Sequence, residues 1–312
     1  MSDRAETSER TTMAPRASEL GDFLRARRAA LRPEDVGLTP YGERRRVPGL
    51  RREELCLLAG VSVTHYTRLE QGRGTRVSRE VLTAIARALR LDEDEISHLM
   101  DLAAPARRPA QPRPEHAGDS ARQLINAMAQ VPALILDRRN DVLAWNGLGH
   151  ALLGGHLDPG DPDLPAHRPN LTRMLFLEEH MRDLYGEHWP EEATLAVASL
   201  RLTAGRNPDD RRLAELVGRL AVQSGEFAER WARHPVRTCT SGTKRMDHPV
   251  VGRLELAFET LQIPKSPGQR LIAYSAAPGS PSERALRDLL PQGRPDAEER
   301  PRAVLSAVAS RG

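Results

Sequence analysis

The chain has 312 residues, of which 39% are apolar, and this length is enough for two domains. No apolar run approaches the roughly 20 residues needed to span a bilayer, so a membrane protein is not expected. Residues 1–18 mix both charges without an apolar stretch, which predicts a disordered tail rather than a signal peptide. Cys56 and Cys239 lie far apart in the sequence, which predicts a reducing, cytoplasmic environment.

The positive charge is concentrated near the N-terminus. The segment Leu20–Leu91 contains fifteen arginines and no lysine against eight acidic residues, a net charge of +7, whereas the whole chain carries only +3. A basic segment of this size suits a polyanionic partner such as a nucleic acid.

Apolar spacing predicts five helices in residues 19–104, which form an all-α domain. A long loop with three prolines, Arg32–Gly49, separates the first helix from the second. Asp92 and Glu95 fit a capping box at the start of the last helix. The predicted helices are Glu19–Leu31, Arg51–Ala59, Ser62–Glu70, Ser78–Leu89 and Asp92–Leu102.

The second and third of these helices have the features of a helix-turn-helix. Gly60 stands at the bend, where a positive φ favours glycine, and the small Cys56 side chain lets the two helices approach closely. Ser62 is placed to cap the next helix by accepting a backbone N–H bond. Five apolar residues are expected to hold the pair together, namely Leu55, Ala59, Val61, Tyr66 and Leu69.

The remaining side chains of the third helix are expected to face outward, as in a helix that enters the major groove of DNA. Arg68 can pair with guanine edges or a phosphate, and Thr64 can hydrogen-bond or contact a thymine methyl group. An ordinary helical hairpin with a solvated polar face is the alternative. The outward set is Val63, Thr64, His65, Thr67 and Arg68.

Residues 105–119 are rich in proline and predict a linker, followed by a second domain in residues 120–290 and a flexible tail in residues 291–312. In the second domain, two short apolar runs predict a β-hairpin, four helices follow, and strand patterns then return before a last helix. This order indicates an α+β domain with an antiparallel sheet and helices on one side. The strands are expected at Ala133–Asp137, Val142–Trp145, Val236–Thr240, Leu254–Phe258 and Leu271–Ser275, and the helices at Leu171–Tyr185, Pro190–Ala204, Asp209–Ser224, Glu226–Arg233 and Ser280–Leu290.

Large amphipathic side chains and scattered polar groups of the second domain are candidates for a ligand pocket, because pockets are mostly apolar with a few placed polar groups. The alternative is that the large side chains belong to the core. The candidates are Trp145, Asn146, Met174, Phe176, Arg237 and His248.

The sequence contains no motif for catalysis, metal binding or cofactor binding. Its ten histidines are scattered without an HExxH pair, and it has no CxxC, GxSxG, P-loop or GxGxxG pattern. We therefore expect neither an enzyme nor a bound metal or cofactor.

The N-terminal region resembles the Cro/C1-type (XRE) helix-turn-helix, and the whole chain is similar to the MmyB-like transcriptional regulators. The matching residues are GVSVTHYTRLEQGRG, with RREEL before it and ALRLDEDEISHLMDLA after it, and the loop VGLTPYGERRRVPGL. The resemblance implies a lambda-repressor-like fold and a homodimer on DNA.

The resemblance also implies roles for particular residues of this domain. Val63, Thr64 and Arg68 are the implied base contacts, and Ser62, Gln71 and Arg73 are the implied backbone contacts. It also implies an ion pair that joins Glu70 to Arg27 or Arg28. Three adjacent arginines of the loop either contact DNA or form a solvated surface, and these are Arg44, Arg45 and Arg46.

The second domain resembles the ligand-binding domain of the same regulators in the segments LDRRNDVLAWN, DHPVVGRLELAFETLQIP and LIAYSAAPGSPSERAL. The resemblance implies a PAS-like fold and a small fatty-acid-like ligand. The sequence therefore predicts a ligand-responsive DNA-binding regulator. The alternative is a protein-interaction or antitoxin-like module that binds DNA to regulate its own synthesis.

Overall fold

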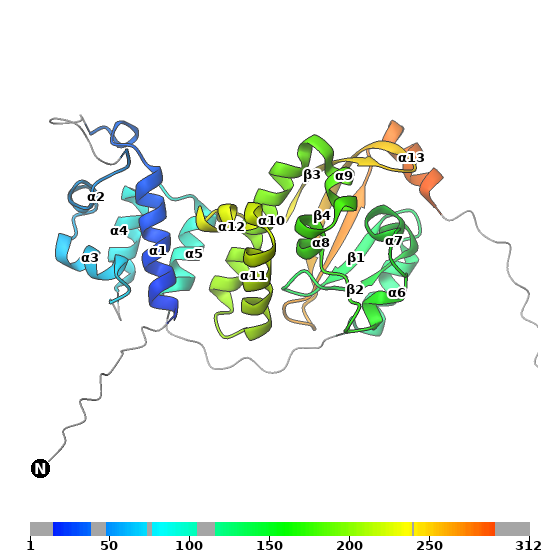
Figure 1. Ribbon diagram of the computed structural model, residues 1–312, viewed down its shortest axis with the longest axis horizontal. Coiled ribbons are helices and arrows are strands. Elements are labelled where there is room, and N and C mark those ends of the chain that lie inside the picture. The colour runs from blue at the N-terminus through cyan, green and yellow to red at the C-terminus, as the bar shows by residue number, and fades with distance from the viewer. Residues whose placement is uncertain (1–14, 39–47, 74–76, 105–115, 239, 291–312) are drawn as a thin grey trace, which may run out of the picture.

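The computed structural model of the protein describes residues 15–38, 48–73, 77–104, 116–238 and 240–290 (Figure 1). It contains an N-terminal group of helices and a mixed domain built on one antiparallel sheet. Arg44, Arg45 and Arg46, which the sequence proposes as DNA contacts, lie outside the described residues.

The N-terminal domain is helical and its helices match the predicted ones to within a few residues. Its core contains fully buried side chains from all five helices and from the loop, including Phe23, Leu50, Leu55, Tyr66, Ile85 and Leu99. The elements are α1 (Pro15–Ala30), a 3₁₀ turn η1 (Glu34–Val36), α2 (Arg52–Ala59), α3 (Val63–Glu70), α4 (Arg79–Ala88) and α5 (Glu93–Ala103). The predicted capping box of Asp92 and Glu95 is present at the start of α5.

The second domain contains a five-stranded antiparallel sheet in the order β2-β1-β5-β4-β3. Alternating side chains of β4 point inward, so that Leu254, Leu256 and Phe258 are buried while Arg253 and Glu255 are exposed. The strands are β1 (Ala133–Leu136), β2 (Val142–Trp145), β3 (Ser241–His248), β4 (Gly252–Gln262) and β5 (Arg270–Ser275).

Several helices pack on one face of this sheet, and the larger apolar cluster of the domain lies between these helices and the sheet. These are α7 (Gly147–Gly154), α8 (Leu171–Leu177), α9 (Glu179–Tyr185), α10 (Trp189–Arg206), α11 (Arg211–Gln223), α12 (Gly225–Ala232) and α13 (Pro281–Leu289), with 3₁₀ turns η2 (Asp161–Asp163) and η3 (Gly186–His188). On the opposite face, α6 (Asp119–Ala127) packs Ile125 against Ile135, Leu143 and Leu271. The expectation that all helices lie on one side is therefore wrong for α6.

Two further expectations about the second domain are wrong. The described residues of the strand predicted at Val236–Thr240, which do not include Cys239, form no strand, because Val236 is buried in the core of the N-terminal domain and Thr238 hydrogen-bonds to Asp94 of α5. The edge strand lies instead at β3, directly after that segment. The single helix predicted at Leu171–Tyr185 is two helices, since Glu178 between them has an extended backbone.

The two domains contact each other along α10. Its C-terminal half packs on α5, and Leu202 of α10 belongs to the apolar cluster of the N-terminal domain. In Figure 1, α2 and α3 lie at the end of the molecule remote from the sheet, while α1 and α5 face α10 and α12. The helix-turn-helix is therefore presented outward from the body of the protein.

Candidate functional site: an exposed helix and a cavity beside the sheet

The bend between α2 and α3 has the geometry that the sequence predicts. Gly60 has φ 65° and its N–H donates to the carbonyl oxygen of Cys56, which ends α2. The Ser62 hydroxyl accepts a hydrogen bond of 3.1 Å from the backbone N–H of His65 and so caps α3. Tyr66 and Leu69 are buried on the inner side of α3. The bend and the cap together fix which face of α3 points outward.

That outward face carries the side chains proposed to contact DNA. Thr64 and Arg68 are exposed and lie one helical turn apart, and Val63 is 38% exposed. His65 and Thr67 are half-buried at the sides of this face. The three proposed backbone contacts are all exposed at the two ends of the helix, namely Ser62, Gln71 and Arg73. The DNA contacts of these side chains stay predictions.

A buried ion-pair cluster holds α3 against α1 and α2. The Glu70 carboxylate is fully buried and accepts hydrogen bonds of 2.7 Å from Arg28 Nε and of 2.7 Å from Arg52 Nε. Burial alone would raise the pKa of Glu70, but the hydrogen bonds from the two guanidinium groups outweigh it and lower that pKa. The partner of Glu70 on α1 is thus Arg28, while Arg27 pairs with Glu95 at 2.6 Å.

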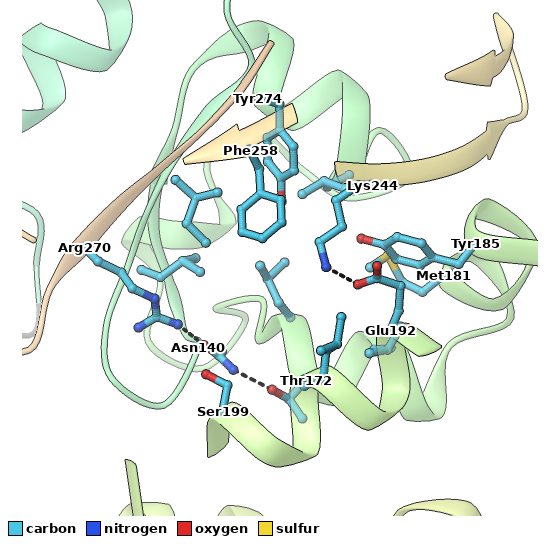
Figure 2. Close-up of a pocket in the computed structure, with 17 residues that line it drawn as sticks. Asn140, Thr172, Met181, Tyr185, Glu192, Ser199, Lys244, Phe258, Arg270 and Tyr274 are labelled. Atoms are coloured by element: carbon cyan, nitrogen blue, oxygen red, sulfur yellow. Dashed lines mark hydrogen bonds and ion pairs between the residues drawn. The ribbon is translucent and has the colours of Figure 1, made fainter. Parts of the chain in front are cut away.

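A cavity of about 120 Å³ lies between the sheet and the helices α8, α9 and α10 of the second domain (Figure 2). Most of its wall is apolar. Its apolar and aromatic lining residues are Leu136, Leu153, Leu171, Leu175, Met181, Tyr185, Leu195, Ala196, Phe258, Ile272 and Tyr274, and its polar ones are Asn140, Thr172, Glu192, Ser199, Lys244 and Arg270.

Two polar clusters face each other across this cavity (Figure 2). On one side, Lys244 of β3 forms an ion pair with Glu192 of α10, and burial raises the pKa of that carboxyl group. On the other side, Arg270 donates to the Asn140 side chain, which itself donates to the Thr172 hydroxyl at 2.7 Å. The cavity thus combines apolar walls with three charged side chains at defined places, Glu192, Lys244 and Arg270.

The structure places the sequence candidates for the ligand pocket outside the lining of this cavity. Trp145 donates its indole N–H to the Pro159 carbonyl oxygen at 2.9 Å, and the Asn146 amide caps α7 and joins the start of β1 to α6. Met174 is fully buried in the core.

The three other candidates also have positions that their neighbours explain. Phe176 packs edge-to-face against Trp189 at 5.6 Å, in the core of the domain. His248 is buried and its Nε2 lies 3.1 Å from the Ala151 carbonyl oxygen, while Arg237 is exposed near the N-terminal domain. The packing alternative that the sequence left open thus describes the surroundings of the large side chains Trp145, Met174 and Phe176, which lie in the core of the domain.

The sequence did not predict the polar residues of the cavity. Glu192 of α10, Lys244 of β3, Arg270 of β5 and Asn140 of the turn between β1 and β2 come from four separate parts of the chain, and only the tertiary fold brings them together. One signal was available, because Lys244 is one of only two lysines in the chain.

Among the described residues, no group of three or more histidine, cysteine or acidic side chains is arranged to hold a metal ion. Within the same residues, none of the helices is both long enough and apolar enough to cross a bilayer.

Comparison with known families identifies both halves of the chain. Residues 117–290 match the family described as the MmyB-like transcription regulator ligand binding domain. Residues 19–99 match a helix-turn-helix domain family. A comparison of the chain with curated proteins finds no match. The family matches agree with an architecture in which α3 belongs to a DNA-binding unit and the cavity to a ligand-binding unit.

Proposed function

The chain belongs to the MmyB-like transcription regulators, and on this premise we propose that α3 reads operator bases while the cavity beside α10 holds an apolar carboxylate such as a fatty acid. The observation that carries the DNA-binding half is the joint exposure of Thr64 and Arg68 on a capped helix that leads out of a glycine bend. The two domains match families of regulators and not of enzymes.

The proposed contacts of α3 follow from the chemistry of its exposed face. Thr64 and Arg68, together with Val63, read base edges in the major groove, where an arginine pairs with guanine. The positive end of the helix and the Ser62 hydroxyl bind a phosphate, and Gln71 and Arg73 bind the backbone beyond the helix. His65 and Thr67 border the same face.

Arginines 44–46 of the loop add phosphate or minor-groove contacts in this proposal. A triple alanine variant at these positions is expected to bind DNA with a flatter dependence on salt. An unchanged salt slope would remove the three side chains from the interface.

Two copies of the chain are proposed to bind two half-sites about 34 Å apart, as helix-turn-helix dimers do. Size-exclusion chromatography with light scattering, with and without operator DNA, tests this arrangement. A strict monomer on DNA would contradict it.

The operator itself is found by selection. The full-length chain is incubated with random duplexes, and bound sequences are recovered over several rounds. A shared, two-fold symmetric sequence supports the regulator proposal, and the chain's own upstream region is then tested by gel shift. Recovery of duplexes without any common sequence would contradict base-specific reading.

The ligand half rests on the cavity, whose walls are mostly apolar and whose six polar lining residues include the charged Glu192, Lys244 and Arg270. We place the carboxylate of the ligand at Lys244, where it takes the position of the Glu192 carboxylate, and the hydrocarbon chain against Leu171, Leu195 and Phe258. A carboxylate held by a buried ammonium group binds more tightly than a neutral head group of the same size.

Binding of dodecanoate and dodecanol by calorimetry tests this placement. The native chain is expected to bind the acid more tightly than the alcohol, and a double variant with Met at positions 192 and 244 is expected to lose that preference while keeping an apolar cavity. Native mass spectrometry after gentle purification reveals a ligand that stays with the protein. If neither compound binds and nothing co-purifies, the apolar ligand class is wrong.

The alternative of an antitoxin-like interaction module has less support. Residues 117–290 form a complete domain with its own sheet, core and cavity, and an interaction module of this kind does not need a cavity with buried charges. The regulator proposal accounts for both domains.

A further inference from the structure

Helix α10 belongs to the ligand cavity at one end and to the DNA-binding domain at the other. It has 18 residues, the most of any helix in the described residues. Glu192, Ala196 and Ser199 in its first part line the cavity, and Leu202 and Gly205 in its last part contact the N-terminal domain. Because the helix is continuous between these parts, a displacement at the cavity is transmitted to the domain contact.

The contact at the far end of α10 is tightly fitted. A Cβ atom added to Gly205 would lie 2.6 Å from Cε1 and 2.8 Å from Nδ1 of His98 on α5. His98 cannot turn away easily, because it is 2% exposed and packs edge-to-face against Phe23 at 5.1 Å. Leu202 inserts one turn away into the same apolar cluster. Absence of a side chain at position 205 is therefore what allows the two domains to meet.

Polar contacts at the edges of this interface lie mostly at the surface. Arg206 of α10 pairs with Asp101 of α5 at 3.0 Å, with both side chains partly exposed. Thr238 donates its backbone N–H to Asp94 at 2.7 Å, and Arg27 of α1 donates to the His234 carbonyl oxygen. Exposed ion pairs contribute little to stability, so the docking depends mainly on the fit around Gly205 and on the burial of Leu202 and Val236 in the apolar cluster of the N-terminal domain.

The cavity is smaller than the ligand that it is proposed to take. Its volume of about 120 Å³ compares with roughly 300–1,000 Å³ for typical ligand pockets. A ligand of ordinary size that enters this cavity completely therefore pushes a wall outward. The sheet side of the cavity is held by the ladders that join β4 to both of its neighbours and β5 to β1 and β4, whereas the helical side has no such ladder.

We propose that ligand entry displaces α10 from the sheet and thereby releases the DNA-binding domain from its contact with Gly205. This inference rests on the proposed function, since it requires that the cavity take a ligand. In the empty protein, the docked domain holds α3 in one orientation relative to the sheet. In the occupied protein, the fit between Gly205 and His98 is lost and the DNA-binding domain reorients relative to the sheet.

Energy transfer between dyes on the two domains measures docking in the full-length chain. Cysteines at two exposed positions, Leu57 on α2 and Val222 on α11, carry the dyes in a background with Cys56→Ala and Cys239→Ser. Labelled protein is diluted with unlabelled protein, so that only transfer within one chain is observed. Loss of docking changes the transfer efficiency and broadens its distribution.

Two pairs of variants separate docking from coupling. Gly205→Leu prevents the close contact between Gly205 and His98 directly. Its control is Gly218→Leu on α11, where an added Cβ would have nothing within 4 Å. Ala196→Phe fills the cavity from α10 without a ligand, and its control is the exposed Thr194→Phe on the same helix. Circular dichroism melting checks that each variant folds, and Ser199→Leu replaces Ala196→Phe if the latter does not fold.

The proposal predicts that Gly205→Leu, Ala196→Phe and saturating dodecanoate all change the transfer efficiency to the same value, while both controls match the native chain. It also predicts that dodecanoate changes neither transfer nor operator affinity in Gly205→Leu, because that variant already has the affinity that the ligand imposes on the native chain. Undocking by Ala196→Phe without any binding of dodecanoate would support the coupling and show only that the ligand class is wrong. Native-like transfer in Gly205→Leu, or in both Ala196→Phe and the dodecanoate-bound chain, would overturn the proposal.

Discussion

Replacement of Glu70 by alanine is expected to loosen α3 while leaving its outward face chemically unchanged. The Glu70 side chain is fully buried, and it balances the charges of Arg28, which is 12% exposed, and Arg52, which is 41% exposed. Removal of one partner of a buried ion pair costs about 3–5 kcal/mol, because the remaining charge stays buried without compensation. Since about 1.4 kcal/mol corresponds to a factor of ten, the opening equilibrium of this region rises by at least about a hundredfold.

Hydrogen exchange of the α3 amides measures this effect, because it reports local opening in a chain whose two domains need not unfold together. The amides of α3 in Glu70→Ala are expected to exchange at least about a hundredfold faster than in the native chain. The matched control is Glu53→Ala, which removes an exposed carboxylate from α2. Equal exchange in the Glu70 and Glu53 variants would refute the role assigned to the buried cluster.

Three further predictions concern other parts of the molecule. Lys244→Met leaves Glu192 without its buried partner and is expected to lower the melting temperature of the second domain in calorimetry. Adding Glu192→Met to this variant is expected to restore most of the lost stability. A double variant as unstable as the single one would contradict this prediction. Gly60→Ala forces alanine into φ 65° and is expected to destabilise the N-terminal domain by about 1–2 kcal/mol in urea unfolding, so an unchanged midpoint would argue against the strained bend. Burial lowers the pKa of His98 to about 3, so His98 stays neutral in the docked form, whereas a solvated His98 takes up a proton as the pH falls below about 6.5. Docking is therefore expected to weaken by up to about 1.4 kcal/mol at pH 5.5. Energy transfer that does not change between pH 7.5 and pH 5.5 would contradict this prediction.

The helix-turn-helix was predictable because its determinants are local. Gly60 specifies the bend, Ser62 specifies the cap, and the spacing of Leu55, Tyr66 and Leu69 specifies the buried side. Each of these residues acts on neighbours within a few positions of the chain, so the pattern is readable before the tertiary structure is known. Tertiary context was needed only to choose Arg28 over Arg27 as the partner of Glu70.

The edge of the sheet was not predictable in the same way. Residues of β3 (SGTKRMDH) are mostly polar and exposed, and only Met246 and His248 are buried, so the strand lacks an alternating apolar pattern. The alternation at Val236–Thr240 gave a false signal, because the N-terminal domain, and not a sheet face, buries Val236. A contact between distant segments thus imitated the local signature of a strand.

The cavity and the domain contact depend on the same kind of distant contact. Asn140, Glu192, Lys244 and Arg270 each have ordinary neighbours in sequence, and their shared location follows only from the order of the strands and the crossing of α10. The proline-rich residues 105–119 predicted only a linker, yet the structure packs Gly205 against His98 and so brings the two domains into direct contact. This contact joins residues that are far apart in sequence, so no local pattern predicts it.

Operator affinity of a double variant, Thr64→Ala with Arg68→Ala, tests the central claim most directly. Its matched control is Thr83→Ala with Arg87→Ala, an exposed pair with the same spacing on α4. By fluorescence anisotropy on the selected operator, we expect the α3 variant to lose about ten- to a hundredfold in affinity, since a good base contact contributes about 1–3 kcal/mol, and the α4 variant to bind like the native chain. Native affinity in the α3 variant would contradict the assignment of α3 as the helix that reads DNA.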